Sequence, residues 1–373
     1  MAEKKKKRSD GYYTVSFRMN GKRYYSYGKT QKEANQKAEE KKKEIASKAF
    51  TKNADEKFSK YFECWIDLKT GSVKEVTIYS YKCIYTNIAN IAIDEKGNSI
   101  ADIKLKDIEP QHIKTIQKTL ACNNSTSTVN QKISLLRSVF GNAVKERIIT
   151  WNPCDTVKDL KKTEPKAVET IHRALTREET KAFFASAENV NSWYLNLYKF
   201  LLLTGCRIGE ASALKYNDID YKQNVIHIRR TLTKSESGGL CIGDTTKSRD
   251  GVRDIPITQK IKNVLESQKE LKRLVGFSLR MDGLIFVSPK NNMVTLEGVS
   301  YDLRKICKLA NIKKFSAHAF RDTFATRAIE CGMNPKTLQK ILGHSKINIT
   351  MEIYTHVMED TKEKEMQLID VAL

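Results

Sequence analysis

The stretch Ser316–Gly332, SAHAFRDTFATRAIECG, decides how the C-terminal half of this chain is interpreted. It predicts a helix that Ser316 caps at the start and Gly332 ends. Helical spacing predicts one apolar face, made of Phe320, Phe324, Ala328 and Cys331. His318 and Arg321 stand in the first turn and point elsewhere, where their positive charge opposes the helix dipole. We therefore expect an anion beside this end of the helix.

Composition narrows the class of protein. The chain has 373 residues of which 40% are hydrophobic, so a substantial core is available. At roughly 100–200 residues per domain, two or three domains are expected. The 66 Lys and Arg residues against 44 Asp and Glu residues give a net charge of +22. This excess is unlike a typical metabolic enzyme and indicates a polyanionic partner.

Cysteine spacing and hydropathy argue against several further classes of protein. None of the eight cysteines forms a C-x-x-C pair, so zinc-ribbon and thioredoxin chemistry find no support. No apolar run approaches the roughly 20 residues that span a membrane. The N-terminus, MAEKKKKRSDG, has no apolar run behind its charges and is not a signal peptide. We expect a cytoplasmic protein with reduced thiols, no bound metal and no membrane contact.

Residues 1–52 predict a small β-sheet packed on one helix. Aromatic and basic residues alternate around an Asn20-Gly21 turn, which is a hairpin signal, and a polar helix follows over 31–48. The residues expected to face DNA are Arg18, Lys22, Arg23 and Lys29, mixed with Tyr13, Phe17, Tyr25 and Tyr27. The alternative is an ordinary basic hairpin whose tyrosines only pack.

Residues 55–158 predict a helical bundle without catalytic groups. Four sets of apolar residues have helical spacing, and these sets begin at Phe58, Ile84, Ile113 and Val129. Pro110 fits the first turn of the third helix. Short connections between the four helices favour a compact bundle. The following segment, 159–173, lacks clear periodicity and is interpreted as a linker.

Residues 174–373 predict a mixed α/β domain. Thr176 and Glu179 form a capping box, and Gly205 breaks a buried helix from a second one. The segments 224–234 and 245–257 are strand-like, the latter with an Asp250-Gly251 turn. Helices dominate from Ile261 onward. The whole chain is therefore expected to be multidomain and mainly α, with small β-sheets.

This last segment also contains the residue types that phosphodiester cleavage requires. The transition state spreads negative charge over the nonbridging oxygens, and without a metal fixed cationic groups must stabilise it. Arginine suits this task because its planar guanidinium binds two oxygens at once. A nucleophile and an acid for the leaving oxygen are also needed. The candidates are Arg207, Lys247, His318, Arg321, His344 and Tyr354, with Lys234 as the alternative lysine.

The motifs TGCRIGEASAL, HAFRDTFAT and LGHSKINITMEIYTHV, with the lysine of TTKSRDG, resemble the catalytic motifs of the tyrosine recombinases, or phage-type integrases. The resemblance covers roughly Leu175–Met358. The order of the segments is most similar to that of the integrases of Gram-positive conjugative transposons. It implies an arm-type DNA-binding domain over 1–52, a SAM-like core-binding domain over 55–158, and a catalytic domain with a C-terminal tail over 174–373.

The resemblance implies a reaction and a role for each candidate. Tyr354 attacks the scissile phosphate and leaves a 3′-phosphotyrosine, and Lys247 protonates the leaving 5′ oxygen. Arg207 and Arg321 clamp the phosphate, and Glu210 supports the site. His318 and His344 hydrogen-bond the phosphate, and His318 also takes the proton of the tyrosine. Because the covalent link conserves the free energy of the phosphodiester, rejoining needs neither ATP nor another cofactor. The implied function is integration and excision of a conjugative transposon or phage.

The implied partners are double-stranded DNA at core and arm attachment sites, three further copies of the chain in a tetramer, and an excisionase or a DNA-bending accessory protein. The implied location is the nucleoid of a bacterium. A chromosome-dimer resolving recombinase or a type IB topoisomerase uses similar chemistry, but the aromatic-basic N-terminal module argues against both. Retention of every candidate residue argues against a non-catalytic DNA-binding regulator. Whether the tail from Asp360 packs locally or on a neighbouring protomer stays open.

Overall fold

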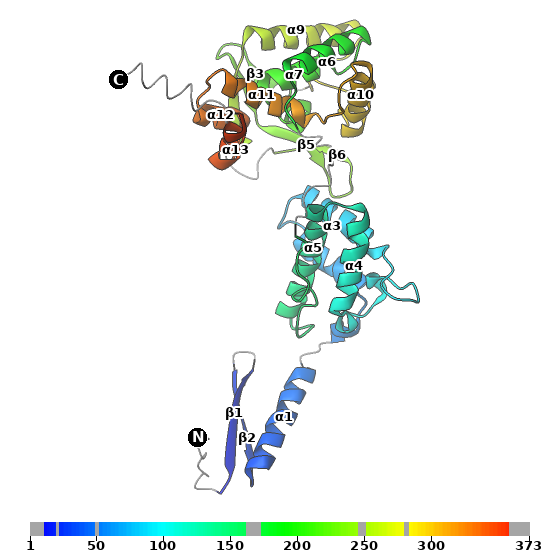
Figure 1. Ribbon diagram of the computed structural model, residues 1–373, viewed down its shortest axis with the longest axis vertical. Helices are drawn as coiled ribbons and strands as arrows, with labels where there is room; N and C mark the ends of the chain where they lie inside the picture. Colours follow the sequence, from blue (N-terminus) through cyan, green and yellow to red (C-terminus); the bar gives the residue numbers. More distant parts are fainter. Residues whose placement is uncertain are drawn as a thin grey trace, which may run out of the picture. The chain divides into compact units, whose positions relative to one another are not determined.

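The computed structural model describes residues 11–19, 22–48, 52–161, 173–244, 251–279 and 283–357 (Figure 1). The structure is mainly helical with small antiparallel sheets, as expected. It divides into two compact units, Met1–Lys166 and Ala167–Leu373. The division into three domains stays a prediction, and most of the predicted linker lies outside the described residues.

The N-terminal hairpin is confirmed. Strands β1 (Tyr13–Met19) and β2 (Lys22–Gly28) pair antiparallel, and the polar helix α1 (Gln31–Lys48) packs on both. The helix approaches so closely that a Cβ at Gly28 would lie 2.4 Å from the backbone nitrogen of Ala34. The expected turn at Asn20-Gly21 lies outside the described residues.

The four predicted helices of the second segment are also confirmed, and aromatic rings fill the space between them. These helices are α2 (Phe58–Lys69), α3 (Glu75–Ala89), α4 (Pro110–Asn123) and α5 (Thr126–Lys145). Pro110 occupies the first turn of α4, where its missing N–H has no intrahelical partner to lose. The Phe62 and Tyr85 rings stack with centroids 4.0 Å apart, joining α2 to α3.

One connection in this bundle is not short, contrary to the prediction. Residues 90–109 link α3 to α4 through two single 3₁₀ turns, η2 (Ile100–Asp102) and η3 (Leu105–Asp107). Isolated bridges Ala92↔Ser99 and Lys57↔Lys104 hold this connection in place. It contributes apolar side chains to the core, namely Ile93, Ile100, Leu105 and Ile108. The connection is long because it is itself part of the packed core.

Helices and two small sheets form the second unit. The helices are α6 (Arg177–Asn189), α7 (Leu195–Thr204), α8 (Ile208–Ser212), α9 (Gln259–Leu274), α10 (Leu296–Leu309), α11 (His318–Glu330), α12 (Pro335–Leu342) and α13 (Ile347–Val357). Helix α7 packs on both α9 and α11. The buried rings of Phe183, Tyr198 and Phe320 meet there with centroids 5.4–5.5 Å apart. Within the described ranges, none of the helices combines the length and apolar character that crossing a bilayer requires.

The strand prediction needs one correction. The stretch 224–234 is two strands in different sheets, β4 (Val225–Ile228) and β5 (Arg230–Lys234). One sheet has the order β3-β4-β7 and the other is the hairpin of β5 with β6 (Leu240–Asp244); β3 is Ile219–Asp220 and β7 is Arg253–Pro256. Strands β6 and β7 thus pair with other strands and not with each other. In the predicted strand-like stretch 245–257, β7 confirms the part after the Asp250-Gly251 turn, while residues 245–250, with Lys247, lie outside the described residues.

The helix that opened the sequence analysis is confirmed with different ends. Helix α11 begins at His318 with Ala317 as its first flanking residue, and no side chain caps it, so Ser316 is not the cap. Gly332 follows the helix with a φ of 75°, as a helix-ending glycine does. Cys331 is exposed and does not join the predicted apolar face. It closes the helix, so helical periodicity no longer governs its direction.

Candidate active site

Gly205 sets the position of Arg207. It ends α7 in the left-handed conformation with a φ of 64°, which glycine adopts without strain. A Cβ there would lie 2.5 Å from the Phe324 ring and 2.8 Å from the Leu342 side chain. This close turn makes Arg207 the first flanking residue of α8, with 42% of its side chain exposed. The Gly205 break predicted from the sequence is confirmed, and it places a half-exposed guanidinium beside α11 and α12.

Arg321 is almost fully buried, and the ends of two helices hold it. Its Nη1 donates to the carbonyl of Gly205 at 2.8 Å, and its Nη2 donates to the carbonyl of Leu342 at 2.8 Å. These carbonyls close α7 and α12, where the helix dipole is negative. The other three N–H donors find no acceptor among the described residues. Burial, followed by the nearby Arg207 charge, lowers the pKa of Arg321 to about 9.

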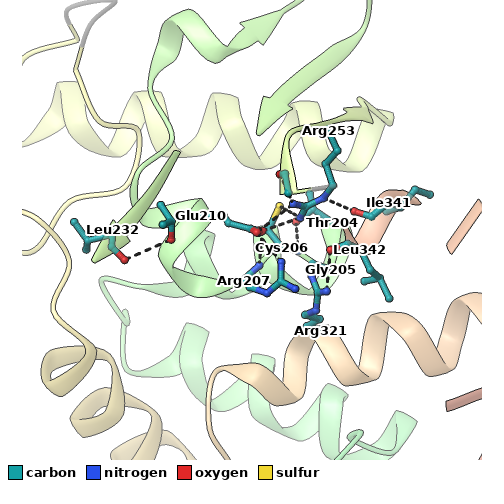
Figure 2. Close-up of polar contacts among 12 residues, drawn as sticks. Thr204, Gly205, Cys206, Arg207, Glu210, Leu232, Arg253, Arg321, Ile341 and Leu342 are labelled. Carbon is teal, nitrogen blue, oxygen red and sulfur yellow. Dashed lines mark hydrogen bonds and ion pairs between the residues drawn. The ribbon is translucent and has the colours of Figure 1, made fainter. Parts of the chain in front are cut away.

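Glu210 joins Arg207 to a second buried arginine, Arg253. Its Oε1 accepts from Arg207 Nη1 at 2.9 Å, and its Oε2 accepts from the Arg207 backbone N–H at 3.0 Å. Arg253 donates to the same two oxygens at 3.1 and 2.7 Å (Figure 2). Burial acts to raise the pKa of Glu210, but these hydrogen bonds and charges hold it below its usual value. Glu210 is therefore an ionised carboxylate shared by two arginines.

Sequence reasoning did not single out Arg253, although a signal for it exists. In β7 the exposure alternates, with Arg253 and Ile255 buried and Asp254 and Pro256 exposed. Ile255 belongs to the core, so a period of two places Arg253 on the same inward face. A charged residue that a strand pattern directs inward requires a buried partner, and Glu210 is that partner.

His344 is buried, whereas His318 is about half exposed. His344 follows Gly343, which ends α12 with a φ of 69°, and only 8% of the residue is exposed. Its Nδ1 lies 3.0 Å from the hydroxyl of Thr350. Burial, followed by the charge of Arg321, lowers the pKa of His344 to about 4, so the ring is neutral at pH 7. His318 is 46% exposed, with its Nε2 3.6 Å from an oxygen of Asp322.

The assembled site carries uncompensated positive charge. Three guanidinium groups, Arg207, Arg253 and Arg321, face one carboxylate, Glu210, while His344 is neutral. Two positive charges remain, and the low dielectric around Arg321 makes an incoming anion more favourable than it would be in water. The anion that the sequence predicts at the start of α11 therefore has a suitable place. Within the protein, the carbonyls at the ends of α7 and α12 supply partial negative charge to Arg321.

The structure describes the other two predicted catalytic residues, Lys247 and Tyr354, only in part or not at all. Lys247 falls in the segment between β6 and β7, outside the described residues, while the alternative Lys234 ends β5 opposite Leu240. The backbone of Tyr354 belongs to α13, but its side chain is not described. Helix α13 packs on α11 and α12, and Ile353 joins the small apolar cluster there. The nucleophile candidate thus belongs to an element that contacts α11, which carries Arg321, and α12, which His344 follows.

The structure also describes only some of the side chains predicted to contact DNA in the N-terminal hairpin. Arg18, Lys22 and Arg23 belong to the hairpin strands, but their side chains are not described. Lys29 is exposed directly after β2, and its backbone N–H donates to Glu33 at 2.9 Å. The aromatic residues expected to accompany them fall into two groups. Tyr25 and Tyr27 are 44% and 45% exposed, whereas Phe17 stacks on Tyr24 with ring centroids 5.7 Å apart.

Comparison with known proteins connects this site to a family. The model of the phage integrase family matches residues 173–361. The "Tyrosine recombinase XerC-like" of Caldanaerobacter subterraneus subsp. tengcongensis is 28% identical over 361 residues, which cover 92% of this chain and 90% of that protein. The ICEBs1 integrase of Bacillus subtilis is 28% identical over 303 residues, covering 78% of this chain and 80% of that protein.

A solved structure extends the comparison to the fold. The Tn1549 transposon integrase in complex with a circular intermediate DNA superposes with a TM-score of 0.67. Its sequence is 23% identical, and the match covers 83% of this chain and 98% of that one. The two chains therefore share a fold.

Proposed function

Because this chain belongs to the phage integrase family, we propose that it is a tyrosine site-specific recombinase that cuts and rejoins DNA to integrate and excise a conjugative transposon or phage. One observation carries the proposal from the residues themselves. Arg321 of α11 donates to the carbonyl of Gly205, two residues before Arg207, so the structure brings two distant arginines to one turn. Both are cationic groups of the kind that a phosphodiester transition state requires.

We assign the chemistry to six side chains and one supporting carboxylate. The Tyr354 hydroxyl gives its proton to His318 as its oxygen forms a bond to phosphorus, the bond from phosphorus to the 5′ oxygen breaks, and Lys247 gives the leaving oxygen its proton. The nonbridging oxygens are held by Arg207, Arg321, His318 and His344, while Glu210 supports Arg207. His344 acts as a neutral donor, in keeping with its lowered pKa. The 3′-phosphotyrosine is then attacked by a 5′ hydroxyl of another strand, which releases Tyr354.

We propose two DNA contacts outside the catalytic domain 174–373. The helical domain 55–158 binds the core site beside the point of cleavage. The N-terminal module 1–52 binds arm sites through the exposed face that carries Tyr25 and Tyr27, followed by Lys29. The net charge of +22 suits a chain that neutralises many phosphates at once.

The proposal includes the assembly and the place of action. We propose a homotetramer on DNA, aided by an excisionase or a DNA-bending protein, in a bacterial cytoplasm at the nucleoid. A tetramer suits the reaction because recombination requires two DNA duplexes and four strand cleavages. The C-terminal tail that would link protomers lies outside the described residues.

A second candidate function is resolution of chromosome dimers, which uses similar strand-cleavage chemistry. The two functions differ in their DNA requirement. Arm sites recognised by residues 1–52 belong to an integrase, whereas a resolving recombinase needs its core site alone. Binding of the hairpin module to DNA outside the core site therefore favours integration.

A nicked suicide substrate tests the central proposal. Cleavage near the nick releases a short strand, so the covalent adduct accumulates and is measured on a denaturing gel. The unmodified protein should form the adduct, and Tyr354→Phe should abolish it while leaving DNA affinity largely intact. Tyr301→Phe is the matched control, since Tyr301 is a 68% exposed tyrosine on α10 and should leave cleavage unchanged. Adduct formation by Tyr354→Phe would reassign the nucleophile, and no adduct with the unmodified protein would refute the proposed function.

A further inference from the structure

Arg253 uses every hydrogen-bond donor that it has. Its Nε donates to the carbonyl of Ile341 at 2.5 Å, and each terminal nitrogen donates to one oxygen of Glu210. The remaining donors meet the carbonyl of Gly251 at 3.4 Å and the sulfur of Cys206 at 3.9 Å. An arginine has five N–H groups, and all five are occupied. Arg253 thus has no N–H left for a phosphate, in contrast to Arg321, whose described partners take two.

The contacts of Arg253 connect the two sides of the site (Figure 2). On one side, Glu210 holds the backbone and the guanidinium of Arg207. On the other, Ile341 belongs to the last turn of α12, whose next carbonyl, at Leu342, accepts from Arg321. His344 follows two residues after Leu342. The chain of contacts closes on itself, because Arg321 also binds Gly205, two residues before Arg207.

We propose that Arg253 is a positioning residue of the strand-cleavage reaction. It fixes Arg207, at the start of α8, against the end of α12, whose last carbonyl holds Arg321 and which His344 follows, and it does so without contacting the DNA. The proposal rests on the proposed function, since it assigns Arg253 a part in that same cleavage. A displacement of about 1 Å among phosphate-holding groups is enough to slow a reaction about a hundredfold.

Burial and geometry indicate that the pair of Arg253 with Glu210 positions the site and does not merely stabilise the fold. The side chains of Arg253 and Glu210 are 5% and 3% exposed, and a pair so deeply buried loses about as much by desolvation as it gains by attraction. We therefore assign this pair its role through the arrangement that it specifies and not through stability. A planar guanidinium reaches Glu210 and Ile341 at the same time from fixed directions. An ammonium at the same position keeps the charge but reaches only one side.

Arg253→Lys therefore tests the proposal, measured with the full chain and the nicked suicide substrate in single turnover. We expect the rate constant of adduct formation to fall about a hundredfold, with the adduct yield at completion and the DNA dissociation constant within about twofold of the unmodified protein. A role in folding alone would lower the yield and leave the rate constant of the folded fraction unchanged. Arg173→Lys is the control, because Arg173 also forms a two-point pair with a carboxylate, that of Glu179, in the same unit.

A second variant covers the case in which Arg253→Lys does not fold. Glu210→Gln keeps the shape of the side chain but removes the charge that both arginines share, and it should also lower the rate constant rather than the yield. If both fold, the double variant should be no slower than the slower single variant, because both act through one connection. The proposal would be overturned if the rate losses of the two single variants multiplied in the double variant. It would also be overturned if the rate constant of Arg253→Lys were unchanged or, where that variant does not fold, if that of Glu210→Gln were unchanged. Failure of the unmodified protein to form any adduct would instead refute the proposed function.

Discussion

The catalytic unit and the N-terminal hairpin use cationic residues in opposite ways. In the catalytic unit, Arg253 and Arg321 are buried, and carbonyls at helix ends hold both of them, at Ile341 and Leu342. In the hairpin module, Lys29 is exposed and lies near exposed tyrosines. Buried and fixed charges suit an exact geometry at one phosphate, while exposed charges suit attraction to a polyanion. Substitutions in the first region should therefore change rates and folding, and those in the second should change salt-dependent affinity.

The largest effect should come from Arg321→Lys, which tests the fixed-charge side of this comparison. Lysine keeps the charge but cannot donate to Gly205 and Leu342 while also holding two phosphate oxygens. We expect the single-turnover rate of strand cleavage to fall by about a thousandfold. DNA affinity, measured by gel shift, should change only a few-fold because many other cations contribute. A cleavage loss that merely followed a loss of DNA binding would remove the distinction between the two regions.

The second-largest effect should be a dependence of the free energy of unfolding on pH, caused by His344. Its pKa is about 4 in the folded protein against 6.5 for an ordinary histidine, so the unfolded state binds more protons between these two values. The free energy of unfolding should therefore fall as the pH drops from 6.5 to 4, by about 3 kcal/mol from this residue. Denaturant titrations at several pH values measure this loss. His344→Gln should flatten the curve in that window, and an equally steep curve in the variant would show that His344 is not the group responsible.

A third prediction separates backbone strain from close contact at the turn that carries Arg207. Gly205 and Gly276 both have a positive φ, 64° and 72°, but a Cβ meets Phe324 at Gly205 and nothing within 4 Å at Gly276. Gly276→Ala should cost about 1–2 kcal/mol of stability from backbone strain alone. Gly205→Ala should cost about 1–3 kcal/mol more, because the new methyl group displaces packed side chains. Equal losses in the two variants, measured by denaturant unfolding, would show that the packing at Gly205 yields easily.

Much of the local structure could be predicted from the sequence because local signals determine it. The capping box at Thr176 and the proline at the start of α4 are both where the sequence placed them. Each depends on contacts within one turn of the chain. The position of Arg207 after the Gly205 break was predictable for the same reason.

The connections between distant segments could not be predicted. The motif around Arg321 suggests an anion as its partner, whereas the partners in the structure are the carbonyls of Gly205 and Leu342, which no pattern around Arg321 identifies. Sheet pairing was also missed, since β4 pairs with β7 across an intervening hairpin. The role of Arg253 could not be predicted for both of these reasons, because it depends on which strand β7 pairs with and on where α12 ends. Local signals determine elements, while long-range contacts determine which side chains meet.

The smallest effect should come from a single exposed lysine of the hairpin module, and it tests the other side of the opening comparison. Lys29→Gln should weaken binding to arm-site DNA a few-fold and lower the slope of log affinity against log salt by about one. Lys37→Gln is the control, because Lys37 is similarly exposed but already pairs with Glu33 at 2.7 Å. Cleavage of a substrate that contains only the core site should be unaffected by either variant. If Lys29→Gln slowed that cleavage without changing the salt slope, the hairpin module would act on the catalytic unit, and the separation of attraction from geometry would not hold.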